Sequence, residues 1–413
     1  MHRLIGLAAF SLAFLAPVFA GDPAAPPKVE PELAPDKDLL AKIEALPDNT
    51  WLKLPPFKVI GELDWLSPKA DERYRGPFGR SYCGLAVWAP ERKRAIYMGG
   101  GHNVRRWSDV WEYDLAANTW VCLRGNDPAG NQVNTEEWFR ANTKMAEDGC
   151  VITKSDGPVA ISHTWSQFCY DPERRVALWV NSMPRSIEYS LKPAQPDNAA
   201  QKGLGLTFDD FQKKLCKDGT YIWEFDPAKR KFMRREYVFN SNVPGNTIGG
   251  RIEEGTMRYV PGLKTIFFNN LLRDPATGEW KPAGGKGGPR YYPACGGDYD
   301  PNTRQLVLCD PRLKTVYGLS IDTREWKELC ANGPAVGGYS FQYDPVAREF
   351  FTLDDGGWSF STARNEWTKK PAAQGDLPAP GPYGFSWYDP ARNVYAVYNC
   401  SDVYVYRCKK SAK

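Results

Sequence analysis

The chain has 413 residues, and its 53 Lys and Arg residues are nearly balanced by 49 Asp and Glu residues. A net charge of only +4 gives no electrostatic case for nucleic acid as a partner. Aromatic residues make up 13% of the chain, and 37 glycines beside only 6 methionines are typical of an all-β protein.

Residues 1–20 have the pattern of a secretory signal peptide. Arg3 is followed by an apolar run from Leu4 to Phe19, and Ala20 ends this segment. The run is short for a membrane span, so we expect export to the periplasm or the extracellular space after cleavage near Ala20. The mature chain should then have no membrane span. A retained membrane anchor is the alternative.

Two short segments separate this leader from the main repeat region. Residues 21–38 are rich in Pro and Ala and predict a linker. Leu39, Leu40 and Ile43 fall on one helical face and predict a short helix over residues 39–48. A basic tail, residues 409–413, ends the chain.

Residues 49–408 repeat one pattern of strands and turns. The first strand of each repeat ends at an aromatic residue, followed in most copies by Asp-Pro; these copies begin at Trp88, Tyr170, Tyr259, Tyr299, Tyr343 and Tyr388. A turn residue followed six positions later by an aromatic residue marks the fourth strand; these turns begin at Asp114, Asp226, Asp274, Ser320 and Ser361. The last repeat therefore lacks a fourth strand.

The missing strand is predicted at the other end of the chain. Asn49-Thr50-Trp51 matches Asn118-Thr119-Trp120, which closes the first repeat. An N-terminal strand that completes the last sheet would hide two sheet edges. We therefore predict an all-β, six-bladed β-propeller whose last blade combines three C-terminal strands with one N-terminal strand.

The repeats resemble the kelch family of β-propellers over residues 49–408. The resemblance is carried by Gly99-Gly100, Trp111-Glu112-Tyr113-Asp114 and Asn118-Thr119-Trp120. Later repeats keep the turns and the Trp but mostly lose the double glycine. Kelch-like propellers include copper-radical oxidases and exported sialic acid mutarotases, so the resemblance implies a fold and leaves the activity open.

Two insertions, residues 124–161 and 182–219, interrupt the repeats, and each is expected to be partly helical. Thr135 and Thr207 are each followed by acidic residues, as at a helix start. In a four-stranded antiparallel blade, the loop after strand two and the link to the next blade emerge on one face. Both insertions should therefore lie on that face, over blades one and two.

The same face should carry a ligand site at the mouth of the central channel. The candidate binding residues are Arg80, Tyr82, His102, Arg105, Arg106, Trp107, His163, Arg251, Arg290 and Tyr291. A ring of arginines would attract an anionic ligand, and the aromatic residues could stack on a sugar. The alternative is that these Arg and His side chains only tie neighbouring blades together.

Metal and cofactor chemistry have little support in the sequence. After cleavage only His102 and His163 remain, too few for a closed metal site, so we expect no metal and no cofactor. Kelch-like copper oxidases carry their ligands late in the chain, where no His occurs here. Glu253 with His163 is the one weak acid–base pair, and it could serve sugar isomerisation.

The leading hypothesis is therefore an exported, non-catalytic propeller that binds a glycan or a protein on the face with the insertions. The alternatives are an isomerase or mutarotase acting on anionic sugars, and a structural envelope protein. The chain's ten cysteines, in an exported protein, also favour disulfide bonds. Cys295 and Cys309, which flank one predicted hairpin, are the suggested pair, although buried free thiols are an alternative.

Overall fold

The computed structural model describes residues 33–64, 77, 83–99, 108–126, 135–158, 164, 166–181, 197, 199–210, 219–239, 247–248, 251–252, 255–289, 295–334, 336, 341–353, 357–378 and 384–410. The segment from Glu32 to the C-terminus forms one compact unit. No helix in these ranges is long and apolar enough to cross a membrane.

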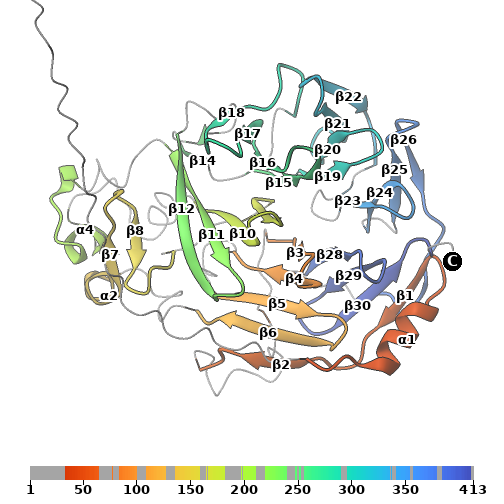
Figure 1. Cartoon of the computed structure of the whole chain (residues 1–413), viewed down its shortest axis with the longest axis horizontal. Helices are drawn as coiled ribbons and strands as arrows, with labels where there is room; N and C mark the ends of the chain where they lie inside the picture. Colours follow the sequence, from red (N-terminus) through yellow and green to blue (C-terminus); the bar gives the residue numbers. More distant parts are fainter. Residues whose placement is uncertain are drawn as a thin grey trace, which may run out of the picture. The chain divides into compact units, whose positions relative to one another are not determined.

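Six antiparallel sheets form the blades of a β-propeller, as predicted (Figure 1). Blade one contains β3 (Val87–Ala89), β4 (Arg94–Tyr97), β5 (Val110–Asp114) and β6 (Thr119–Arg124). Blade two contains β9 (Phe168–Asp171), β10 (Val176–Asn181), β11 (Gly219–Asp226) and β12 (Lys231–Phe239). Blade three contains β15 (Met257–Val260), β16 (Thr265–Phe268), β17 (Leu271–Arg273) and β18 (Trp280–Pro282).

Blades four and five contain β19 (Gly296–Asp300), β20 (Gln305–Asp310), β21 (Thr315–Ser320) and β22 (Trp326–Cys330); and β23 (Gln342–Asp344), β24 (Glu349–Thr352), β25 (Trp358–Ser361) and β26 (Glu366–Lys369). Blade six contains β28 (Phe385–Asp389), β29 (Val394–Tyr398), β30 (Val403–Arg407) and β1 (Thr50–Lys53). A short 3₁₀ turn, Pro261–Leu263, and a hairpin of β13 (Thr247–Ile248) with β14 (Arg251–Ile252) complete this part of the chain.

The ring closes through β1, as the sequence predicted. β1 pairs antiparallel with β30, with Trp51 opposite Tyr406, and the Tyr406 hydroxyl donates to Asn49 at 2.6 Å. Helix α1 (Lys37–Ala45) precedes this strand, and Arg407 donates to the Ile43 carbonyl at 2.6 Å. The N-terminal segment is therefore fixed to the last blade by backbone and side-chain hydrogen bonds.

Two short outer strands were not predicted. β27 (Gln374–Gly375) pairs parallel with β1, and β2 (Lys58–Gly61) pairs parallel with β6 of blade one. The chain from β1 to β2 thus runs from blade six to blade one. Across the same junction, the rings of Tyr97 and Phe385 stack with centroids 3.6 Å apart.

The turn between the first two strands of each blade, called here the Asp–Pro turn, has one geometry throughout. The third residue after Pro has a positive φ between 50° and 57° in all six turns: Lys93, Arg175, Lys264, Arg304, Arg348 and Asn393. Where Asp precedes Pro, as in Asp171 and Asp344, its carboxylate accepts backbone N–H groups two and three residues later. This local geometry explains why the sequence signal is so regular.

At three of the Asp–Pro turns, the tyrosine before the turn is hydrogen-bonded to the preceding blade. The hydroxyl of Tyr259 donates at 3.2 Å to Glu173, the residue after Pro in the preceding blade, and Tyr170 bonds to Glu91 in the same way. Asn302 donates to the Tyr343 hydroxyl at the equivalent place. Between blades three and four that position is Gly262, where a Cβ atom would lie 2.6 Å from the Tyr299 hydroxyl.

The two insertions pack on one another. The first contains α2 (Glu136–Asn142), capped by the Thr135 hydroxyl, with β7 (Thr143–Met145) and β8 (Val151–Thr153); the second contains α4 (Ala199–Gly203). Gly203 lies directly against Phe139, because a Cβ atom there would come within 2.4 Å of the Phe139 Cβ. Figure 1 shows these elements together beside blade two.

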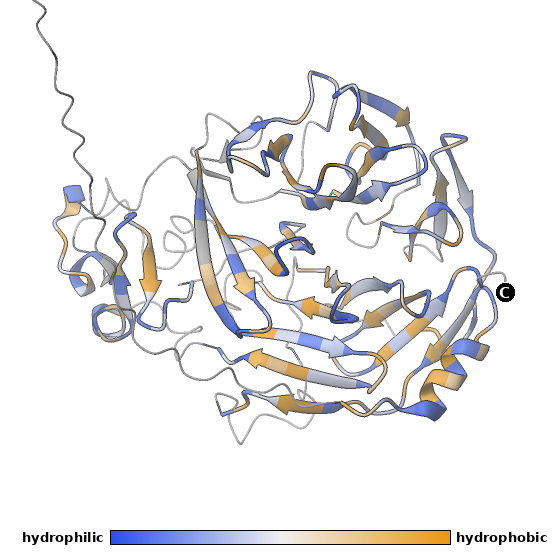
Figure 2. Ribbon diagram, viewed as in Figure 1, coloured by the Kyte–Doolittle hydropathy of each residue, from blue (hydrophilic) through white to orange (hydrophobic). Residues whose placement is uncertain are grey.

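The core lies between blades, and Figure 2 shows apolar residues on the strands and hydrophilic residues at the turns. Nine of the cysteines are described, and no disulfide joins any two of them, so the predicted disulfides are absent among them. The Cys295–Cys309 pair was wrong for a geometric reason. The strand register sets Gly296, and not Cys295, opposite Cys309.

The Asp–Pro turn of blade six predicts a pH-dependent stability. Burial raises the pKa of Asp389 to about 6, although Arg392 opposes the shift. The folded state therefore holds this proton more tightly than the unfolded state, and stability is lost as pH rises from about 4 to about 6. Relative to wild type, Asp389→Asn should gain about 2–3 kcal/mol of unfolding free energy across that window, measured by urea unfolding.

Asp300 is the matched control at the same position of blade four. Burial raises its pKa too, but hydrogen bonds from Thr362 and Thr303 outweigh burial and lower the pKa overall. Asp300→Asn should therefore lose stability at neutral pH, which is the opposite sign. An Asp389→Asn variant whose stability keeps a constant offset from wild type between pH 4 and 6 would contradict the assignment.

Candidate functional site

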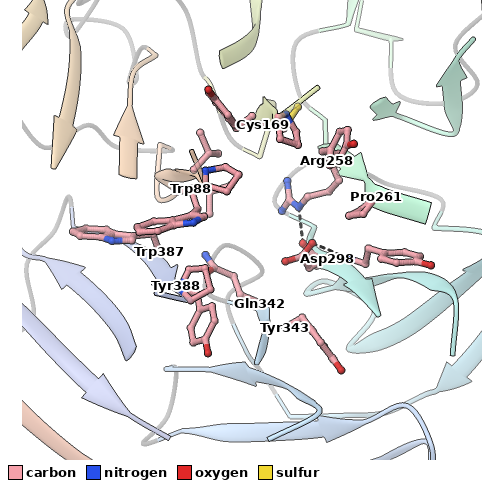
Figure 3. Close-up of a pocket in the computed structure, with 18 of the residues that line it drawn as sticks. Trp88, Cys169, Arg258, Pro261, Asp298, Gln342, Tyr343, Trp387 and Tyr388 are labelled. Carbon is pink, nitrogen blue, oxygen red and sulfur yellow. Dashed lines mark hydrogen bonds between the residues drawn. The ribbon is translucent and has the colours of Figure 1, made fainter. Parts of the chain in front are cut away.

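A cavity of about 660 Å³ lies between the inner strands β3, β9, β15, β19, β23 and β28 (Figure 3). Every blade contributes to its lining, and the prolines of all six Asp–Pro turns belong to it: Pro90, Pro172, Pro261, Pro301, Pro345 and Pro390. The volume lies within the range of small-molecule sites in proteins. The axial cavity is therefore the candidate functional site.

One position of the repeat gives the cavity its chemistry. The residue before the recurring aromatic residue lines the cavity in each blade, and it differs every time: Val87, Cys169, Arg258, Asp298, Gln342 and Trp387. The aromatic residues and prolines around it are nearly constant because they build the turns and the blade contacts. The repeat thus forms a uniform frame with a variable lining.

Arg258 is buried, and its side chain is fully occupied by protein acceptors. Nε donates to the Gly297 carbonyl at 2.6 Å, and Nη1 donates to the carbonyls of Ser166 at 3.0 Å and Met257 at 2.6 Å. Nη2 donates to Ser166 Oγ at 2.9 Å and to the Cys295 carbonyl at 3.4 Å. Since a guanidinium has five N–H groups, none is left for a ligand. Arg258 joins blades two, three and four.

Asp298 has the opposite character. It is only partly buried, and one carboxylate oxygen accepts the Tyr299 backbone N–H at 2.7 Å. Among the residues with described positions it forms no ion pair and no second hydrogen bond. Burial raises the pKa of the Asp298 carboxyl, and the nearby Arg258 charge partly opposes the shift. Most of the hydrogen-bonding capacity of this carboxyl is therefore available to a ligand.

Gln342 is the second polar group with unused capacity. Its side chain lines the cavity, and within the described ranges the amide forms no hydrogen bond. Only its backbone is engaged, through a 3.1 Å hydrogen bond from the Tyr395 hydroxyl to the Gln342 carbonyl. The amide can both donate and accept.

An aromatic surface faces these polar groups. Figure 3 shows Trp88, Trp387 and Tyr388 across the cavity from Arg258 and Asp298. Trp387 is only 1% exposed, so the half-buried Trp88 and Tyr388 supply most of this surface. Tyr388 is held in place by a 2.7 Å hydrogen bond from its hydroxyl to Asn393. The cavity thus has a polar side and an aromatic side.

The one described thiol of this cavity is unreactive, and the described residues form no metal-binding cluster. Cys169 is 4% exposed, and burial raises the pKa of its thiol, so it stays protonated and unreactive near neutral pH. No group of three His, Cys, Asp or Glu side chains that could hold a metal ion occurs in the ranges with described positions.

Most of the residues predicted to form the site lie outside the described residues: Arg80, Tyr82, His102, Arg105, Arg106, Trp107, His163, Glu253, Arg290 and Tyr291. Only the backbone of Arg251 is described, in β14, where it pairs with Ile248. Sequence analysis did not identify Asp298 and Gln342. The one available signal was the position before the recurring aromatic residue, where polar residues stand in place of the usual apolar core.

Comparisons with known proteins were made by sequence and by structure. No protein-family model matches the sequence, and no curated protein matches it. Among solved structures, TolB from Acinetobacter baumannii aligns with a TM-score of 0.35 and 11% identity over 68% of this chain. The chain spans only about half of TolB, 52% of its length.

Two further solved structures align with most of the chain. One is in a mitotic checkpoint complex, with a TM-score of 0.44 and 11% identity over 95% of this chain and 99% of that one. The other is an oligogalacturonate lyase in complex with manganese, with a TM-score of 0.38 and 9% identity over 79% and 89%. Similarity at this level carries no functional information. The strand pairing itself defines the class, a six-bladed β-propeller with an axial cavity.

The hydrogen bonds of Arg258 predict a structural role. Arg258→Met should lower the unfolding free energy by roughly 2–4 kcal/mol, because the Ser166 hydroxyl and several buried carbonyls lose their donor. Urea unfolding measures this loss, and Arg258→Lys should restore part of it. Arg304→Met is the control, since Arg304 forms an exposed ion pair with Asp322 and its loss should have little effect. Unchanged stability of Arg258→Met would refute the role.

Proposed function

We propose that this protein is an exported binding protein that holds an uncharged, polyhydroxylated ligand, a glycan, in its axial cavity. The observation that carries the proposal is the two-sided lining, with Asp298 and Gln342 facing the half-buried Trp88 and Tyr388. Sugar hydroxyls can donate to a carboxylate and accept from an amide, while the C–H face of a sugar packs on an aromatic ring.

Charge supports an uncharged ligand. Arg258 offers no free N–H to an anion, and the Asp298 carboxylate would repel one. A cation near Asp298 would meet the positive charge of Arg258, which has no ion-pair partner in the described part of the chain. Both charges are tolerated by a neutral ligand with many hydroxyl groups. The described cavity therefore gives no support to anionic sugars.

The sequence-based site stays a separate prediction. The Asp–Pro turns lie at the C-terminal ends of the inner strands, whereas the insertions are linked to the opposite ends. A glycan in the cavity leaves the face with the insertions available for a protein partner or for a longer part of the same ligand. Substituting Arg106 and Trp107 tests that second surface, and unchanged binding would remove it from consideration.

Export is part of the proposal because of the leader-like residues 1–20. The nine described cysteines form no disulfide with one another and do not require an oxidising compartment, so this inference rests on the leader alone. N-terminal sequencing of protein recovered outside the cytoplasm should give Gly21 as the first residue. Recovery of the chain only from the cytoplasm with Met1 retained would refute export.

The binding site predicts a specific loss on substitution. In a glycan array followed by calorimetry on the binding sugars, Asp298→Ala and Trp88→Ala should each weaken binding at least about tenfold, a change of ~1.4 kcal/mol. The reason is that each removes one side of the cavity. Asp322→Ala, an exposed aspartate outside the cavity, is the control and should bind as wild type does. Failure of wild type to bind any glycan would refute the proposal, as would unchanged binding by both cavity variants.

A further inference from the structure

Asp298 and Gln342 occupy the same position of two adjacent blades. Asp298 precedes Tyr299 on β19, and Gln342 precedes Tyr343 on β23, and these two inner strands are neighbours in the ring. Figure 3 shows both side chains beside one another at the cavity. The propeller thus places a carboxylate and a primary amide side by side, each with unused hydrogen-bonding capacity.

The two groups differ in what they can offer. An ionised carboxylate only accepts hydrogen bonds, whereas the amide nitrogen of Gln342 can donate two. A ligand group that matches both must have a hydrogen-bond donor on the side of Asp298 and an acceptor on the side of Gln342. A secondary amide has this form, with N–H directed one way and C=O directed the other. A hydroxyl can do either and is not distinguished.

We propose that the Asp298–Gln342 pair recognises a secondary amide of the ligand, the acetamido group of an amino sugar, with N–H donating to Asp298 and C=O accepting from Gln342. This inference rests on the proposed glycan function and specifies the class of sugar. It makes Asp298 and Gln342 specificity-determining residues of the cavity.

The surroundings of the pair fit an amide better than a charged group. An amide carries no net charge, so it avoids repulsion from Asp298 and from the fully bonded Arg258. The aromatic side formed by the half-buried Trp88 and Tyr388 offers an apolar surface to the methyl of an acyl group. A buried donor and acceptor left unpaired also penalise a ligand that lacks the amide, which is how polar sites reject close analogues.

The test compares three ligands by calorimetry on the full mature chain. They are N-acetylglucosamine, glucose, and N-acetylglycine N-methylamide, which carries secondary amides but no sugar. Wild type should bind N-acetylglucosamine at least about tenfold more tightly than glucose, a difference of ~1.4 kcal/mol. Binding of the small diamide in preference to both sugars would assign the recognised amide to a peptide and would overturn the glycan assignment.

Two variants test the donor. Gln342→Glu replaces the N–H₂ by a second acceptor at nearly constant volume, and Gln342→Met removes the donor without adding charge. Both should weaken binding of N-acetylglucosamine about tenfold more than binding of glucose, so that the preference for N-acetylglucosamine is lost. Thermal melting verifies that each variant is folded. Gln374→Glu, at an exposed position of β27, is the matched control and should keep the wild-type preference.

The outcomes separate the two proposals. Glucose and N-acetylglucosamine bound equally well by wild type would overturn amide recognition and leave the glycan function intact. The same holds if both Gln342 variants keep the preference. Absence of binding to every ligand of the array and to the diamide would overturn both proposals.

Discussion

A ring of sheets is stable only if its first and last blades are joined, and here that junction depends on the pairing of β1 with β30. The pairing places Trp51 against Tyr406, with ring centroids 5.0 Å apart, and leaves no free sheet edge in the middle of blade six. β2 then extends the same segment along blade one. The cavity is lined by all six blades, so it is enclosed only when the ring is closed. The candidate site therefore depends on this junction.

Within the ring, two kinds of position have different tasks. The Asp–Pro turns and the aromatic residues before them set the hairpin geometry and connect adjacent blades, as Tyr259 does with Glu173. In blades four and five the residue just before the aromatic side chain is not used for either task, whereas Arg258 connects blades from the same position of blade three. Asp298 and Gln342 stand at such positions, so a carboxylate and an amide can be carried at the axis without disturbing the repeat.

The sequence predicted the blades, their number and the closing strand because these depend on local turn signals, such as Asp171-Pro172 and its copies. It missed β2 and β27 because parallel pairing between distant segments leaves no local signal. It also missed Asp298, since a polar residue on an inner strand cannot be told from a buried structural one without its partners. The predicted disulfide failed for a similar reason: the number of cysteines says nothing about the register of Cys309.

The absence of a tyrosine hydrogen bond between blades at Gly262 limits which substitutions Arg258 can accept in evolution. Between blades three and four, Gly262 has no side chain to accept a hydrogen bond from the Tyr299 hydroxyl, and Arg258 instead bridges the two blades through the Gly297 carbonyl. A residue that lines the cavity thus makes the connection between blades that a tyrosine at the Asp–Pro turn makes elsewhere. Substitutions that change the ligand can occur at positions 298 and 342 without loss of a contact between blades. A substitution at position 258 would first require another bond between the same two blades.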